Sequence, residues 1–311
     1  MRAVAFNRFG GPEVLGVADL PVPQPGQGEV RVKVAAATIN PTDLGMRAGR
    51  QAATLESMEP PYVPGMELAG VIDAVGVGSN WQVGDRVLGI ALPMRTGRGA
   101  QAEHVVVPSE SVVRIPSGVT FEDAATLPMN GLTARRALDL LALQPGQTLA
   151  VTGAAGAVGG YAVQLGAESG LRVIGVASAA DEALVRGFGA QDFVPRSDDV
   201  ATAIRASVPN GVDGLVDAAV IGRPVLGAVK DGGKIAVVRA FEGEPERGIS
   251  VDHVRVSDYA RNQPALQGLA DLVSQGKLTL RVAETFEAER CAEAHARMHE
   301  GGIRGRLVIL F

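Results

Sequence analysis

Three glycines spaced three residues apart, Gly153, Gly156 and Gly159, could hold the phosphates of a dinucleotide. The apolar run before them, 148–151, predicts a strand, and the run after them, 158–168, predicts a helix. Where a strand turns through glycines into a helix, the backbone can approach a pyrophosphate and the helix N-terminus attracts its charge. The alternative is a tight turn that binds nothing, because GxxGxxG is less specific than GxGxxG. The residues expected to bind are Gly153, Ala155, Gly156, Ala157, Val158 and Gly159.

The residues that follow the next apolar run, 171–177, indicate which dinucleotide this loop would bind. Folds that select NAD place an acidic residue about 20 residues beyond the glycines, where it binds the ribose 2′-OH. Here Ser178 directly follows the run, and its hydroxyl can donate to a 2′-phosphate without repelling it. Arg196 follows the third expected strand, and a guanidinium suits a phosphate, although a solvated loop charge is the alternative. We therefore predict NADPH as the cofactor.

Composition limits the classes of protein to which the chain can belong. Its 311 residues suffice for one large or two ordinary domains, and 46% apolar and 20% charged residues are typical of globular proteins. A net charge of −5 without a basic block argues against nucleic acid. No apolar run reaches the roughly 20 residues of a membrane span, and the first ten residues read as a strand rather than a signal peptide. A single cysteine, Cys291, fits a cytoplasmic location.

Two patterns of secondary structure divide the chain. Residues 1–120 contain short β-type runs separated by Gly and Pro, which predict a barrel or sandwich. From 148 to 239 strands and helices alternate, which predicts a parallel sheet with right-handed crossovers. After Phe241 this alternation stops. Two amphipathic helices and a final strand follow, and we expect this tail to pack on the first part of the chain.

Several segments taken in order resemble the medium-chain dehydrogenase/reductase superfamily, specifically its zinc-independent, quinone oxidoreductase-like branch. Besides the glycine loop, the resemblance is carried by Thr38–Asp43, Pro61–Gly70, Val83–Val87 and Asn130–Ala134. It implies an α/β fold with a GroES-like β-barrel domain, 1–121 and 260–311, and a Rossmann domain with a doubly wound parallel sheet, 122–259. It also implies an active site between the domains and a homodimer. We expect dimerisation by edge pairing of the strand Lys234–Val238.

The resemblance and the sheet pattern also place the other candidate site residues. Without a metal, a hydride acceptor that becomes negatively charged on oxygen needs a hydrogen-bond donor, and Asn40 is the candidate by family position. It is expected to contact the cofactor as well, although an Asn beside Pro41 is often only a turn residue. Weaker catalytic candidates are Asp43, which could orient Asn40 or cap the local helix, and Tyr62, which could serve packing alone. The remaining cofactor contacts are expected at Thr133, Ala219, Val220 and Val238.

A zinc site is not expected. A catalytic zinc needs three protein ligands, and zinc-type relatives carry a Cys and a His where this chain has Asn40–Thr42 and Met66. His295 and His299 lie four residues apart, but no third ligand is apparent, so we expect two partly exposed helix residues.

Three functions remain open. The first is an NADPH-dependent reductase of quinones or similar conjugated carbonyl compounds. The second is an enoyl reductase that reduces the C=C bond of an α,β-unsaturated ketone in secondary metabolism. The third is a nucleotide-binding sensor that has lost turnover, because fold does not establish function.

Overall fold

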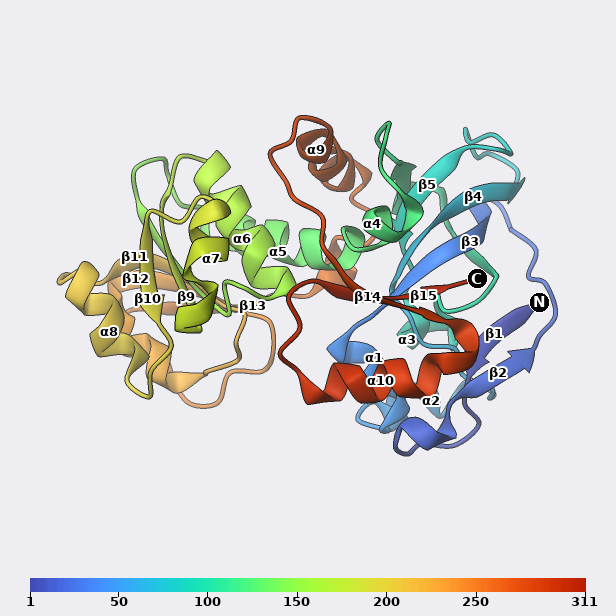
Figure 1. Ribbon diagram of the computed structural model, residues 1–311, viewed down its shortest axis with the longest axis horizontal. Coiled ribbons are helices and arrows are strands. Elements are labelled where there is room, and N and C mark those ends of the chain that lie inside the picture. The colour runs from blue at the N-terminus through green and yellow to red at the C-terminus, as the bar shows by residue number, and fades with distance from the viewer. The chain divides into compact units, whose positions relative to one another are not determined.

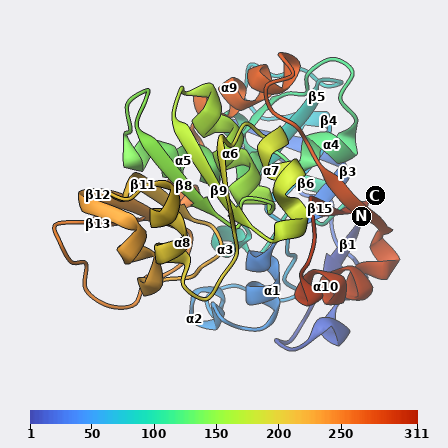
Figure 2. The same cartoon turned by 60° about the vertical axis from the view of Figure 1, so that its left-hand side comes forward.

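The computed structural model describes all residues, 1–311, and they form two compact units. The first unit comprises residues 1–129, 260–274 and 280–311, and the second comprises 130–259 and 275–279. Figures 1 and 2 show the strands and helices of both from two directions. No helix is long and apolar enough to cross a lipid bilayer.

The first unit is built on a seven-stranded sheet in the order β14-β15-β3-β4-β5-β7, with β6 paired to β3. A separate antiparallel pair consists of β1 and β2. The strands are β1 Arg2–Ala5, β2 Gly16–Asp19, β3 Glu29–Ile39, β4 Glu67–Val75, β5 Arg86–Ile90, β6 His104–Pro108, β7 Val112–Arg114, β14 Val282–Glu287 and β15 Arg306–Leu310. Because β15 pairs with β3, the C-terminal tail completes this unit.

Strand β3 is the longest strand of this sheet and lies in its centre. In its first half the apolar residues Val30, Val32 and Val34 are buried while Lys33 is exposed, which is the alternation of a strand with one face in the core. The second half, which ends at Ile39, is almost wholly buried. The buried end of β3 leads directly into the predicted site residue Asn40.

Short helices surround this sheet. They are α1 Pro41–Arg47, α2 Ala52–Leu55, α3 Pro93–Thr96, α4 Phe121–Ala125, α9 Gln263–Ser274 and α10 Cys291–Glu300. Helix α1 has a proline at its first position, where the missing N–H costs nothing. Helix α4 is capped by Thr120, whose hydroxyl accepts the N–H of Asp123 at 3.1 Å. Helix α10 packs beside α1 (Figures 1 and 2).

The second unit contains a six-stranded parallel sheet in the order β10-β9-β8-β11-β12-β13. Its strands are β8 Thr148–Thr152, β9 Arg172–Ala177, β10 Asp192–Pro195, β11 Val212–Asp217, β12 Val229–Val237 and β13 Ser250–His253. Its helices are α5 Pro128–Leu141, which begins in the first unit, α6 Ala157–Glu168, α7 Glu182–Gly187 and α8 Val200–Ser207. The strand order reverses between β8 and β11, which creates a topological switch point (Figure 2).

The helix expected over 222–229 is present as a 3₁₀ helix over 223–228, with a proline at its start. One expectation for this sheet is wrong. The strand containing Lys234 is not an edge, because β12 pairs with β11 on one side and with β13 on the other. The proposed dimer contact through Lys234–Val238 is therefore excluded, and β13, which the sequence pattern missed, forms that edge.

Candidate functional site

The glycine loop has the close packing that a dinucleotide-binding turn requires. Gly153 follows β8 with a φ of 62°, in the left-handed region that favours glycine. A Cβ at Gly153 would lie 3.2 Å from the backbone nitrogen of Ala219, and one at Gly159 would collide with the carbonyl oxygen of Gly153. Gly156 is the N-cap of α6 and has no side chain that could occupy the space before the helix. The turn therefore brings backbone close to a helix N-terminus, as a pyrophosphate site needs.

The other predicted loop residues lie at the start of α6. Ala157 and Val158 are its first two residues, and buried Ala155 precedes the N-cap Gly156. In an α-helix the N–H groups of the first turn have no acceptor within the helix. These donors and the helix dipole suit a negatively charged ligand at this end of α6.

The end of β9 carries no exposed, unpaired carboxylate. Ser178 is half-buried and precedes a 3₁₀ turn, Ala179–Asp181. Asp181 is buried, and Glu182 is paired with Arg186 at 2.8 Å. Exposed Arg196 is held next to this strand end, because its N–H donates to the carbonyl oxygen of Ala177 at 2.7 Å.

The remaining predicted cofactor residues of this unit lie on α5 and after two strands. Thr133 is buried in α5. Ala219 and Val220 follow β11, and half-buried Val238 follows β12, so these three lie at the carboxyl ends of parallel strands. Val220 has a φ of 57° although it is β-branched, and 46% of its surface is exposed. Such a conformation is strained and occurs where the surrounding structure imposes it.

In the first unit, the side chain of Asn40 lies in a buried polar cluster. Its Nδ2 donates to Thr38 Oγ1 at 3.1 Å and to Glu67 Oε2 at 3.0 Å, and its Oδ1 accepts from Arg306. Asn40 and Glu67 are wholly buried. Both amide hydrogens of Asn40 therefore have acceptors within the protein, and one must be released before Asn40 can donate to a substrate oxygen.

Asp43 connects two segments of the first unit. One carboxylate oxygen accepts the N–H of Asn40 at 2.7 Å, at the start of α1, and the other accepts the N–H of Gly65 at 3.0 Å. Burial raises the pKa of Asp43 to about 7, although the two N–H groups and the charge of Arg306 act in the opposite direction. The side chain does cap the local helix, which is one of the two roles expected for it.

Tyr62 makes the contacts of a packing residue. Its ring stacks on Phe9 with 5.9 Å between centroids and 5° between planes, and it also packs against Phe6. Its hydroxyl donates to the carbonyl oxygen of Met58 at 3.0 Å. These contacts match the packing alternative, and its catalytic role stays a prediction.

One of the two histidines of α10, His295, differs from the expectation of partial exposure. His299 is exposed, but His295 is completely buried, with its Nε2 3.3 Å from Gln101 Oε1. Burial, followed by the charge of Arg47, lowers the pKa of His295 to about 3, so it is neutral. No group of three or more His, Cys, Asp or Glu side chains is placed to hold a metal ion.

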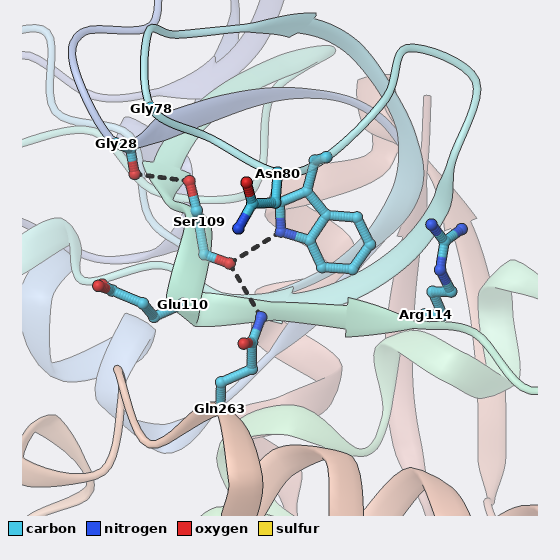
Figure 3. A pocket seen from close by; sticks show the side chains of 8 residues that line it. Gly28, Gly78, Asn80, Ser109, Glu110, Arg114 and Gln263 are labelled. Carbon is cyan, nitrogen blue, oxygen red and sulfur yellow. Dashed lines mark hydrogen bonds between the residues drawn. The ribbon is translucent and has the colours of Figure 1, made fainter.

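A pocket of about 370 Å³ in the first unit contains none of the predicted residues. Some of its polar groups are bonded to one another around Ser109 (Figure 3): Trp81 Nε1 and Gln263 Nε2 both donate to the carbonyl oxygen of Ser109, at 3.0 and 3.2 Å. Arg114 on its rim is paired with Asp85. We assign this pocket no function.

Sequence reasoning missed several polar residues that lie beside the candidates. They are Thr38, Glu67 and Arg306 in the first unit, and Thr152 and Asp217 in the second. All five are buried. The available signal was a polar residue at a position where an apolar strand predicts burial, because such a group needs a bonded partner.

Comparison with known proteins gives two family models that match the chain. The alcohol dehydrogenase GroES-like domain matches residues 26–117, and the zinc-binding dehydrogenase model matches residues 188–309. The quinone oxidoreductase of Homo sapiens is 30% identical over 333 residues, which cover 100% of this chain and 98% of that protein.

Solved structures agree with this result. An NAD-dependent alcohol dehydrogenase superposes with a TM-score of 0.88 at 30% identity, covering 100% of both chains. CurK enoyl reductase superposes with a TM-score of 0.87 at 26% identity, covering 99% of this chain and 98% of its own. The similarity thus extends over both units of the chain.

Proposed function

Because the chain belongs to the medium-chain dehydrogenase/reductase superfamily, among its quinone oxidoreductase-like members, we propose that it is an NADPH-dependent reductase of quinones or similar conjugated carbonyl compounds. The observation that carries the proposal is the arrangement of residues at the carboxyl ends of β8 and β9 in the second unit's sheet. There a close-packed glycine loop opens α6, and Ser178 and Arg196 lie at the neighbouring strand end. The family uses a nicotinamide cofactor, and the choice of NADPH rests on these two side chains.

The preference for NADPH follows from charge. A ribose 2′-phosphate beside Ser178 would meet a hydroxyl donor and the guanidinium of Arg196. The carboxylate of Glu182 would repel it little, since it is paired with Arg186. NADH would lose the contacts to the phosphate, and no free acid is present to bind its 2′-OH.

The bound nicotinamide would supply the hydride, and the protein would position the acceptor and stabilise its developing negative charge. We propose Asn40 as the donor to the acceptor oxygen. Its Nδ2 would release the hydrogen bond to Thr38 or to Glu67 and donate to the acceptor oxygen instead. Because one hydrogen bond replaces another, the net cost in free energy is small. Asp43 would keep Asn40 in place through the backbone, and Tyr62 would contribute through the packing of its ring on Phe6 and Phe9.

We propose that this chemistry proceeds without zinc, although one matching model is named for zinc-binding dehydrogenases. The donor set does not fit: the cluster around Asn40 contains no Cys or His, and its carboxylates are bonded to Thr38, Asn40 and backbone N–H groups. Zinc sites in proteins are built from Cys, His and carboxylates. Metal analysis of the purified protein should give well below one zinc per chain.

Two alternatives are kept. Reduction of an enone C=C bond is favoured by the similarity to CurK enoyl reductase, and it would yield a saturated ketone where a quinone yields a hydroquinone. A nucleotide-binding sensor would bind NADPH without turning over any acceptor.

The test is oxidation of NADPH with a quinone and a conjugated enone in parallel, with NADH as control and product analysis of each. Turnover with NADPH preferred supports the proposal, and the faster acceptor identifies the substrate class. Tighter binding of NADH would overturn the cofactor assignment. Saturable binding with no turnover would favour the sensor.

We also propose a homodimer, as expected from the resemblance. With β12 paired on both sides, the available edge beside it is β13, Ser250–His253. Sedimentation should give twice the chain mass of 32.1 kDa, and a monomer mass would refute the proposal.

A further inference from the structure

Two threonine–aspartate pairs connect β8 to β11, one at each end of these strands. At the amino end, Asp213 accepts the hydroxyl and the N–H of Thr148, both at 2.7 Å. At the carboxyl end, Asp217 accepts the hydroxyl of Thr152 at 2.6 Å. The two pairs are four residues apart on both strands, so the same chemistry occurs twice on the same scaffold.

Only the pair at the carboxyl end also holds the loop that follows β11. Asp217 accepts the N–H of Ile221 at 3.1 Å on one oxygen and the N–H of Gly222 at 2.9 Å on the other. The hydroxyl of Thr152 donates to Asp217 and accepts the N–H of Ala219 at 3.0 Å. Three backbone N–H groups of the loop 218–222 are therefore fixed by these two side chains.

Burial makes this arrangement strong. Asp217 is 2% exposed and Thr152 is completely buried. A buried carboxylate needs several donors, and hydrogen bonds to a charged acceptor are about twice as strong as neutral ones. Removing Asp217 would leave the partly buried N–H groups of Ile221 and Gly222 without this acceptor, so the loop would have to rearrange.

The loop that Asp217 holds borders the glycine turn. Thr152 directly precedes Gly153, whose Cα is so close to Ala219 that a Cβ there would lie 3.2 Å from its nitrogen. The same loop carries Val220 in its strained conformation. Both segments lie at the switch point between β8 and β11, where ligands of such sheets bind.

We propose that Asp217 is a positioning residue for the dinucleotide. Through Thr152 and the loop 218–222 it fixes one wall of the crevice whose other wall is the glycine turn, so that the crevice is formed before the cofactor binds. The inference rests on the proposed function, because it assumes that this crevice binds a nicotinamide dinucleotide. The effect is on cofactor affinity and not on the chemical step.

Asp213 supplies the matched control. It lies on the same strand and is bonded to the same neighbouring strand, but at the opposite end, with Lys230 as an additional partner. Burial alone would raise its pKa, but Lys230 and Thr148 together lower it to about 2. D213A should therefore destabilise the sheet without touching the crevice.

The experiment measures the Kd for NADPH by nicotinamide fluorescence, together with kcat, KM and urea unfolding, for wild type, D217A and D213A. We expect D217A to raise the Kd and KM for NADPH at least tenfold and to change kcat less than threefold. D213A should lower the midpoint of unfolding but leave the Kd within twofold. Equal weakening by both variants, or an unchanged Kd in D217A, would overturn the inference.

If D217A fails to fold, a second pair of variants tests the hydrogen bonds that connect Asp217 through Thr152 to the loop 218–222. T152S keeps the hydroxyl and should retain the wild-type Kd, whereas T152V removes it at similar volume and should weaken binding. A wild-type Kd in T152V would count against the inference. Failure of the wild-type protein to bind NADPH or NADH would instead refute the proposed function itself.

Discussion

Arg306, on the last strand β15, donates to the side-chain oxygen of Asn40 at the start of α1 and to the carbonyl oxygen of Ile39. It is 5% exposed, and its charge also acts on Asp43. The guanidinium is therefore a cation that compensates the buried carboxylate of Asp43, and it connects the last strand to the predicted catalytic residue.

Arg306→Gln should be strongly destabilising. Removing one partner from a buried charged cluster typically costs about 3–5 kcal/mol, because the remaining charge is left uncompensated. Urea unfolding measures the loss, and Arg255→Gln, at an exposed position, is the control that should change stability by less than about 0.5 kcal/mol. Equal stability of the two variants would show that Arg306 does not compensate the cluster.

His295 and Asp43 should give opposite contributions to the pH dependence of stability. The pKa of His295 is about 3 in the folded protein against 6.5 ordinarily, so its contribution is full above pH 6.5 and is lost as the pH falls toward 3. The pKa of Asp43 is about 7 against 3.8, so its contribution is greatest below pH 3.8 and is lost as the pH rises to 7. Between pH 4 and 6.5 the stability contributed by His295 therefore rises with pH about as steeply as that contributed by Asp43 falls, so the two slopes nearly cancel.

His295→Gln separates these two contributions. The difference in unfolding free energy, wild type minus variant, should rise by about 1 kcal/mol per pH unit from pH 4 to 6.5 and then level off. Taking the difference removes the titration of all other groups. A difference independent of pH would show that His295 titrates normally.

Gly159→Ala should abolish or severely weaken NADPH binding. The added Cβ would collide with the carbonyl oxygen of Gly153, which is backbone and cannot turn away. Gly268→Ala is the matched control, because this glycine lies within α9 with nothing inside 4 Å of its Cβ position. The control should bind NADPH normally and gain about 0.5–1 kcal/mol of stability. Titration of both variants with NADPH, followed by fluorescence, decides the matter, and normal binding by Gly159→Ala would contradict the close packing of the turn.

Arg196→Ala should reduce selectivity for NADPH. Loss of a charge-assisted contact to the 2′-phosphate is expected to raise the Kd for NADPH about tenfold, or about 1.4 kcal/mol. The Kd for NADH in the same variant is the internal control and should not change. A parallel change for both cofactors would assign Arg196 a structural role.

Local patterns predicted the second unit well. The expected strand 148–151 is β8 without its last residue, and the expected helix 158–168 is α6 without its first residue. A strand, a glycine turn and a helix are encoded within about 20 consecutive residues, so their signals do not depend on distant contacts. Strand β13 was missed because Ser250–His253 is a short, half-exposed edge strand with no apolar run.

The polar cluster of the first unit could be predicted only in part. Asn40 and Asp43 belong to one short motif, but their partners come from other strands. Pairing of β3 with β4 and with β15 brings Glu67 and Arg306 to Asn40 across 27 and 266 residues of sequence. Strand pairing at such separations depends on the whole sheet, and a single sequence does not specify it.

The position of β15 also affects the order in which the two units can fold during translation. The sheet of the first unit needs Arg306–Leu310 beside β3, so this pairing cannot form until the ribosome has made residue 310. All strands of the second sheet lie between residues 148 and 253, so they can pair while the residues after 253 are still being synthesised. The second half of β3, Ala36–Ile39, must therefore wait for β15 after the second sheet can already have formed.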